Sequence, residues 1–241
     1  MSEREQRLLD RVSDVPGEGP IRVLLDRISG PGPQSTEWLT SNEEGLYILQ
    51  EAKGSLMLEG AGAEWKHFIR APTAVWIASG FRAAFVNTAD TPPRGIRFSA
   101  VAQGLDPTNR LTESEGSRIA ELSELPQRCM VSFLTRTVFS RSGSDGLLRL
   151  SEIQTILPGG SVPAHRHPDR CEACFVLCGT GVFSIDGDER EVRAGEAGFV
   201  SPGETHGVLN RSDEVLEYII AQFGAAAAAA ATAIAREKGK P

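Results

Sequence analysis

The run GGSVPAHRHPDRCEACFVLCG, residues 159–179, carries most of the information about the fold of this 241-residue chain. It places His165 and His167 two positions apart, and residues so spaced on an extended strand face the same side. A turn at Pro168 would bring Glu172 back on the next strand, within reach of both imidazoles. The run therefore predicts two strands that present one cluster of polar side chains.

A second run, GEAGFVSPGETHGVLN at residues 195–210, supplies a third imidazole, His206. The chain has only 4 His, and three of them fall in these two runs. Three neutral imidazoles and one carboxylate suit a divalent transition metal such as Fe, Mn, Ni, Co, Cu or Zn. Four protein ligands leave positions on an octahedral metal open for a substrate or O₂. For an isolated His-x-His, exposed loop residues would be the preferred interpretation.

Together the two runs resemble the paired motifs of the cupin superfamily, Gly-x5-His-x-His-x4-Glu-x6-Gly and Gly-x5-Pro-x-Gly-x2-His-x3-Asn. The match departs from the pattern at Ser201, which stands where the family has Pro. The other fixed positions are occupied by Gly159, His165, His167, Glu172, Gly179, Gly195, Gly203, His206 and Asn210.

This resemblance implies an all-β fold of double-stranded β-helix (jelly-roll) barrels with the metal inside. It implies one divalent metal, Fe or Mn before Zn, Ni, Co or Cu. The implied ligands are His165, His167, Glu172 and His206, with Asn210 as a pocket candidate.

An internal duplication extends the interpretation to the first half of the chain. The interval from Gly54 to Gly80 nearly equals that from Gly179 to Gly203, and a Gly-x2-Ala-x3-Asn pattern replaces Gly-x2-His-x3-Asn. Aligned in this way, the ligand positions of the first half hold no metal-binding set. They are occupied by Thr40, Asn42, Tyr47 and Ala83.

We therefore expect a two-barrel protein with one active barrel. Short β-prone runs with Gly, Pro, Asn and Asp between them support strands in both halves. The expected parts are a degenerate barrel at 16–103, a linker at 104–128, a metal-binding barrel at 129–224 and an Ala-rich tail at 225–241. Short helices are expected at both termini, and a further one is an option over Ser117–Leu125.

Five side chains are candidates for the substrate pocket. Two interpretations of Arg170 stay open. It either holds a substrate carboxylate through two hydrogen bonds or is an exposed arginine in a turn. Cys174 belongs to a Cys171-Cys174-Cys178 series on one expected strand, which favours buried small residues over a thiolate cluster. The remaining candidates are Phe183, Val208 and Asn210.

Composition limits the partners. The net charge is −7 and the basic residues do not cluster, which argues against nucleic acid. A charged start and four Cys without a secretion signal favour a reduced cytoplasmic protein. We expect that the Ala-rich tail does not span a membrane and that the ligand is a small molecule. As the family implies, we also expect a homodimer.

Three functions are open at this stage. The first is a metal-dependent enzyme, with Fe(II) oxygenase chemistry on a small polar metabolite as the leading reaction. The second is a hydrolase, isomerase or lyase that uses Mn or Zn as a Lewis acid. The third is a non-catalytic module that binds a small molecule through its metal.

Overall fold

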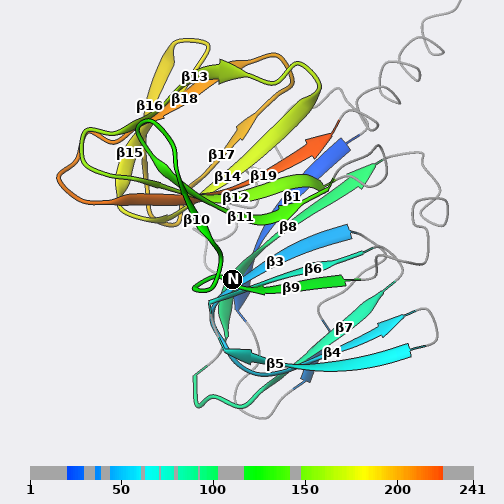
Figure 1. Ribbon diagram of the computed structural model, residues 1–241. Helices are drawn as coiled ribbons and strands as arrows, with labels where there is room; N and C mark the ends of the chain where they lie inside the picture. The colour runs from blue at the N-terminus through cyan, green and yellow to red at the C-terminus, as the bar shows by residue number, and fades with distance from the viewer. Residues whose placement is uncertain are drawn as a thin grey trace, which may run out of the picture. The chain divides into compact units, whose positions relative to one another are not determined.

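The computed structural model describes residues 21–29, 36–38, 44–60, 63–70, 72–78, 81–91, 93–102, 117–141 and 148–224. All regular elements within these ranges are β-strands, which confirms the all-β fold (Figure 1). The helices expected at the two termini, like the Ala-rich tail, lie outside the described ranges. Within them, no helix is long and apolar enough to cross a bilayer.

The chain forms two compact units, Ile21–Leu125 and the part from Pro126 onward. The N-terminal unit has one sheet in the order β1-β8-β3-β6-β9 and another in the order β2-β7-β4-β5. Its strands are β1 (Ile21–Ser29), β2 (Thr36–Trp38), β3 (Glu44–Glu51), β4 (Lys53–Gly60), β5 (Ala63–Arg70), β6 (Thr73–Ile77), β7 (Arg82–Asn87), β8 (Arg94–Ala102) and β9 (Ser117–Glu121).

The C-terminal unit repeats this plan with one sheet ordered β10-β11-β12-β19-β14-β17 and another ordered β13-β18-β15-β16 (Figure 1). All pairings are antiparallel. Its strands are β10 (Gln127–Cys129), β11 (Leu134–Ser140), β12 (Leu148–Ile156), β13 (Ser161–Arg166), β14 (Arg170–Cys178), β15 (Thr180–Ile185), β16 (Asp188–Arg193), β17 (Ala197–Val200), β18 (Thr205–Leu209) and β19 (Leu216–Gly224).

Each unit has its own apolar core between its sheets. In the N-terminal unit Tyr47, Val75 and Phe85 belong to a cluster that is closed to solvent. In the C-terminal unit Phe183 and Tyr218 form the centre, with their rings in edge contact at 5.5 Å between centroids. Burial of aromatic and branched side chains on one face of each sheet is the main driving force for such a sandwich.

One element differs from expectation. Ser117–Glu121 is strand β9 and not a helix, because it pairs with the edge of β6, where Ile119 lies opposite Val75. Ile119 packs against the N-terminal core, and this burial outweighs the weak local helical preference. The segment expected to be a linker thus contributes a strand to the N-terminal unit.

The strand registers also refine the internal duplication. Gly54 pairs with Asn87. In the C-terminal unit Val182 pairs with Leu209, so the antiparallel register sets the preceding residue, Gly181, opposite Asn210. The counterpart of Gly54 is therefore Gly181, two positions beyond the Gly179 chosen from spacing alone. A Cβ at Gly54 would lie 2.0 Å from the carbonyl oxygen of Val86, so the close strand approach requires glycine there.

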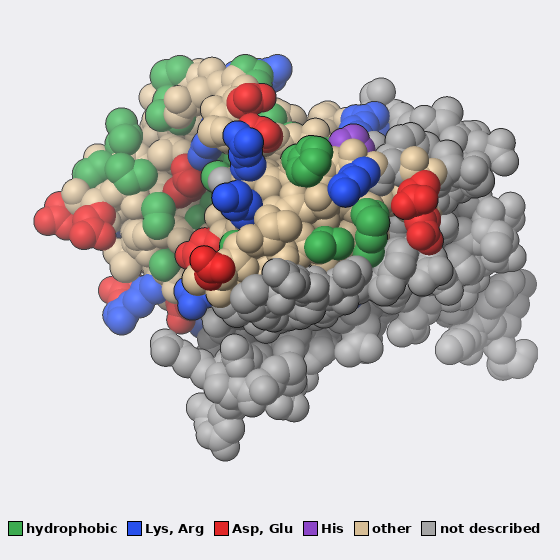
Figure 2. All heavy atoms as spheres, turned by 90° about the horizontal axis from the view of Figure 1, so that it is seen from below, with side chains coloured by type: hydrophobic (Ala, Val, Ile, Leu, Met, Phe, Trp, Pro, Cys, Tyr) green, Lys and Arg blue, Asp and Glu red, His purple; other side chains and the backbone are tan. Residues whose placement is uncertain are grey.

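The charged side chains of the described residues can be followed on one face of the molecule. On the face shown in Figure 2, the described Lys and Arg side chains are interspersed with Asp and Glu. Such mixing is typical of an ordinary solvated surface.

The structure places Asn210 away from the pocket, at a turn. Its side-chain nitrogen donates to the carbonyls of Ile156 and Glu214 at 2.9 and 2.7 Å, and its oxygen accepts from the Ser212 amide at 3.0 Å. Asn210 is fully buried, so these bonds replace all contact with water. The interpretation of Asn210 as a pocket residue is corrected: it joins the ends of β12, β18 and β19.

Replacing Asn210 with Ala should destabilise the C-terminal unit by about 2–4 kcal/mol, because buried backbone groups lose their partners. Thermal unfolding of the metal-free protein measures this, with an expected fall in Tm of about 10 °C or more. Ser212→Ala is the control, since it removes only hydroxyl hydrogen bonds at the same turn. Equal Tm values for both variants would contradict the role of Asn210.

Candidate metal centre

Two strands that are distant in sequence bring the histidines together. His165 on β13 lies directly opposite His206 on β18 in the antiparallel ladder, and a bulge between Val162 and His165 adjusts the register. His167 follows β13 by one residue and returns to the same face. The pairing therefore brings three imidazoles together at one end of the four-stranded sheet.

The three rings form a compact cluster. The ring centroids of His165 and His206 are 4.3 Å apart, and those of His167 lie 4.9 Å from His165 and 5.3 Å from His206. One nitrogen from each ring can be chosen so that all lie within 4.8 Å of one another. This spacing allows one metal ion to bind all three nitrogens.

Glu172 completes the cluster from the opposite sheet. Its two carboxylate oxygens lie 3.7 Å from His167 Nε2 and from His206 Nε2. On β19, its ladder partner Gln222 donates through Nε2 to Glu172 at 2.7 Å. Arg170 donates to the Gln222 oxygen at 3.2 Å, which fixes the amide orientation because arginine has no acceptor.

Two of the three imidazoles, those of His165 and His206, are oriented as metal ligands require. His165 Nδ1 lies 2.9 Å from the Pro163 carbonyl and His206 Nδ1 lies 3.3 Å from the Glu204 carbonyl, so Nδ1 of each donates. Their Nε2 atoms then carry lone pairs. His206 Nε2 is buried without a hydrogen-bond partner among the described residues, which is costly unless an ion binds there.

The electrostatics also suit a cation. Burial, with help from the neighbouring His165, Arg170 and His206, lowers the pKa of His167 to about 4. His167 is therefore neutral at physiological pH and keeps a lone pair for a metal. Burial raises the pKa of Glu172, while the Gln222 hydrogen bond opposes the shift. A bound cation would stabilise the carboxylate form that burial disfavours.

A cavity of about 250 Å³ opens from this cluster into the barrel. Of the five pocket candidates, Arg170 and Val208 line it, whereas Phe183 and Cys174 belong to the core cluster beside it. The complete lining consists of Leu150, Glu152, Gln154, Val162, His165, His167, Arg170, Glu172, His206, Gly207, Val208, Tyr218, Ile220 and Gln222.

The cysteines do not form a thiolate site. All four are free, and Cys171 and Cys174 are buried. Burial raises the pKa of Cys171 to about 11 and raises that of Cys174 still further, so both remain thiols. A Cβ at Gly198 would come within 2.8 Å of Cys174 Sγ, which places this side chain tightly against β17.

The N-terminal barrel has no equivalent ligand set among its described residues. Gly45 lies opposite Ile77 in its ladder, just as Glu172 lies opposite Val200. Since Ile77 and Val200 hold equivalent places in the two barrels, Gly45 is the counterpart of Glu172. The ring of Tyr47 occupies the space in front of Gly45, and Ala83 stands at the His206 position. The alignment from spacing alone, which made Tyr47 the counterpart of Glu172, was displaced by two residues. Thr40 and Asn42 lie outside the described ranges.

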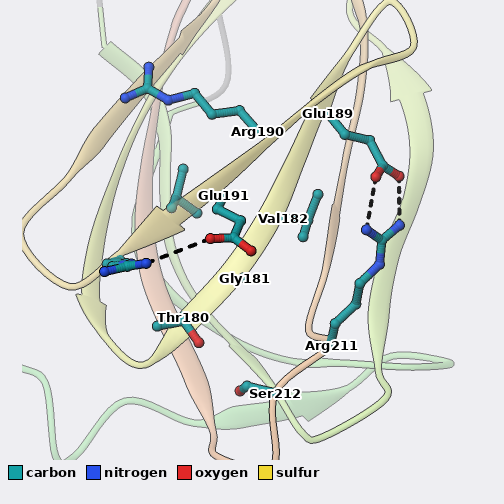
Figure 3. Close-up of a pocket in the computed structure, with 10 residues that line it drawn as sticks. Thr180, Gly181, Val182, Glu189, Arg190, Glu191, Arg211 and Ser212 are labelled. Atoms are coloured by element: carbon teal, nitrogen blue, oxygen red, sulfur yellow. Dashed lines mark hydrogen bonds and ion pairs between the residues drawn. The ribbon is translucent and has the colours of Figure 1, made fainter.

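A larger hollow of about 560 Å³ lies on the C-terminal unit over β15 and β16 (Figure 3). Four of the five charged side chains that line it are already paired, since Arg211 donates two hydrogen bonds of 2.7 and 2.8 Å to Glu189, and Arg193 lies 3.7 Å from Glu191. We regard the smaller cavity as the candidate site, because the histidine cluster opens into it.

Comparisons with known proteins agree with this geometry. A family model described as a cupin domain matches residues 152–221. The oxalate-binding protein of Thermotoga maritima is 30% identical over 82 residues, which are 34% of this chain and 68% of that protein. The chain belongs to the cupin family. The matched cupin domain contains Glu172 and all three clustered histidines.

Solved cupin structures support the same fold over both units. The structure of oxalate decarboxylase from Bacillus subtilis at pH 4.6 has a TM-score of 0.65 and 14% identity, covering 88% of this cupin and 70% of that chain. Another structure, from work on the Mn(II) centres of the same enzyme, has a TM-score of 0.65 and 14% identity over 88% of this cupin and 71% of that chain. At this identity the likeness shows the fold alone.

The motif-based interpretation missed the cavity residues contributed by β12 and β19. These include Glu152, Gln154, Tyr218 and Gln222. Their alternation along both strands was a usable signal, because residues two apart share a face. Which face points inward depends on pairing with β14, and this pairing was not specified by the motif.

Replacing His206 with Ala should weaken metal binding by more than about 100-fold, because loss of even an outer partner of a ligand costs 10–100-fold. Isothermal titration of the metal-free protein with Mn²⁺ measures the change. His67→Ala is the matched control, since His67 is exposed on β5 of the other unit. Unchanged affinity in His206→Ala would show that this cluster is not the metal site.

Proposed function

We propose that the C-terminal barrel is the active site of a metal-dependent enzyme that acts on a small carboxylate. The observation that carries the proposal is the convergence of three imidazoles and Glu172 on a cavity that also receives Arg170. A bound divalent metal would supply Lewis acidity and open coordination positions for a chelating substrate. The family relative named as an oxalate-binding protein supports a carboxylate ligand.

Mn and Fe are the metals we propose first. Imidazole and carboxylate donors without thiolate suit both, and soft cations that prefer sulfur gain nothing here. The Mn(II) centres named for the Bacillus subtilis decarboxylase support Mn. His165, His167, Glu172 and His206 would hold the ion.

Arg170 is the residue we assign to the substrate carboxylate. It uses Nε toward Asp169 and Nη1 toward Gln222, both at 3.2 Å, and no described residue occupies Nη2. The side chain is 35% exposed, so an incoming anion can reach it from the mouth of the cavity. Because its position depends on Gln222, the same contact links substrate binding to the orientation of Glu172.

Oxalate should bind the Mn-loaded protein and bind Arg170→Ala about 10–100-fold more weakly, because a charge-assisted hydrogen bond is lost. Isothermal titration measures both affinities. Arg190→Ala serves as the control, since Figure 3 shows this arginine on the outer strand β16. Equal oxalate affinity of wild type and Arg170→Ala would overturn the role of Arg170, and absence of oxalate binding to the metal-loaded wild type would overturn oxalate as a ligand.

The reaction type follows from one further experiment. Oxygenase chemistry remains our first proposal for an Fe-loaded site, and a decarboxylation like that named for the structural neighbours is the second. Oxygen uptake and CO₂ release are measured together with oxalate as the probe. Oxidation of oxalate by O₂ without oxygen insertion gives two CO₂ and H₂O₂, so uptake of O₂ with no H₂O₂ formed supports the oxygenase. CO₂ with formate but no net O₂ uptake supports the decarboxylase.

Binding without turnover by either metal form would favour the third candidate, a ligand-binding cupin. The name of the Thermotoga maritima relative favours this alternative. A homodimer and a cytoplasmic location remain predictions about the protein.

A further inference from the structure

The wall of the cavity beyond the metal cluster is polar on one side. Ladder pairs between β12 and β19 set three successive layers of inward-facing side chains. The layers are Leu150 with Gln222, Glu152 with Ile220, and Gln154 with Tyr218. A carboxylate therefore lies one layer deeper than Gln222, the partner of Glu172.

Glu152 has little compensation for its charge. Among the residues that the structure describes, it receives one hydrogen bond, from Thr137 Oγ1 at 3.2 Å, and no ion pair. Its charge contributes to raising the pKa values of Glu172 and Tyr218, so all three groups share one electrostatic environment. Two carboxylates in a cavity of this size repel each other unless a cation or hydrogen-bond donor lies between them.

A metal at the histidine cluster would compensate Glu172 and leave Glu152 facing the rest of the cavity. Tyr218 cannot supply the missing donor, because its hydroxyl donates to Gln154 Oε1. Apolar side chains, Val162, Val208 and Ile220, form other parts of the wall. The free oxygen of Glu152 is thus suited to a group brought by the ligand.

We propose that Glu152 is a specificity residue that binds a hydroxyl or ammonium group at the far end of the substrate. This inference rests on the proposed function, in which the metal and Arg170 hold the carboxylate end. The substrate class is then a small carboxylate with a hydrogen-bond donor several bonds away, such as a polyhydroxy or amino-hydroxy acid. The cavity volume of about 250 Å³ lies just below the range of about 300–1,000 Å³ that is usual for pockets of drug-sized ligands, which limits the ligand to a small metabolite.

A series of three probes, which differ only in the substituent on the last carbon, tests the inference. Lactate, glycerate and isoserine share the 2-hydroxycarboxylate end and carry a methyl, hydroxymethyl or aminomethyl group at the other. Titration of the Mn-loaded protein should show glycerate and isoserine binding at least about tenfold more tightly than lactate. The pair 2-hydroxybutyrate and 2,4-dihydroxybutyrate repeats the comparison with a longer reach.

Glu152→Gln keeps the shape and removes the charge, and Glu152→Leu removes the acceptor. The preference should fall in Glu152→Gln and disappear in Glu152→Leu, whereas lactate affinity stays within about threefold of wild type. Glu191→Gln is the control, because Glu191 is exposed on β16. The wild-type probe series remains decisive if a Glu152 variant does not fold.

The possible outcomes separate the two proposals. If the donor-bearing probes bind no more tightly than the methyl probe in both the three-membered series and the pair, while oxalate still binds, the role of Glu152 alone is overturned. The role of Glu152 is likewise overturned if the Glu152 variants retain the preference for donor-bearing probes. Failure of oxalate and of all five hydroxy-acid probes to bind overturns the proposed function, and the role of Glu152 with it.

Discussion

The candidate site depends on the antiparallel pairing of β13 with β18. This ladder brings together two stretches of chain about forty residues apart and sets His165 directly across from His206. A shift of one residue would turn one imidazole to the outside of the sheet, because side chains alternate across a strand. The bulge after Val162 belongs to this register, and the backbone therefore determines the cluster before any metal binds.

The opposite sheet contributes through a second ladder with a different function. Pairing of β14 with β19 sets Glu172 beside Gln222, and Arg170 holds the amide in one orientation. The carboxylate is consequently aimed by hydrogen bonds that originate on the same two strands. Two sheets that carry complementary halves of the site must stay in fixed registration, and the apolar layer around Phe183 and Tyr218 provides that restraint.

Sequence reasoning succeeded where the information was local. His165, His167 and Glu172 lie within eight residues, and strand periodicity with one turn was sufficient to bring them together. It failed where long-range pairing decides: Ser117–Glu121 is a strand because β6 offers a partner edge. The alignment of the first half was displaced by two residues, an error that strand periodicity cannot reveal because both positions share a face. Glu152 and Gln222 were missed for a related reason, since only the pairing of β12, β19 and β14 directs them inward.

The Asn210 network and the histidine cluster lie at opposite ends of β18, four residues apart. The turn end is closed by hydrogen bonds to backbone atoms, while the other end is open and built from side chains. This division separates what maintains the barrel from what selects a ligand. Substitutions at the open end can accumulate during evolution without loosening the scaffold, so related proteins can acquire new substrates on an unchanged frame. In the N-terminal barrel Asn87 makes two of these turn bonds, to the Thr91 carbonyl and from the Ala89 amide, although Ala83 stands at the histidine position, which is the pattern that such a separation leaves behind.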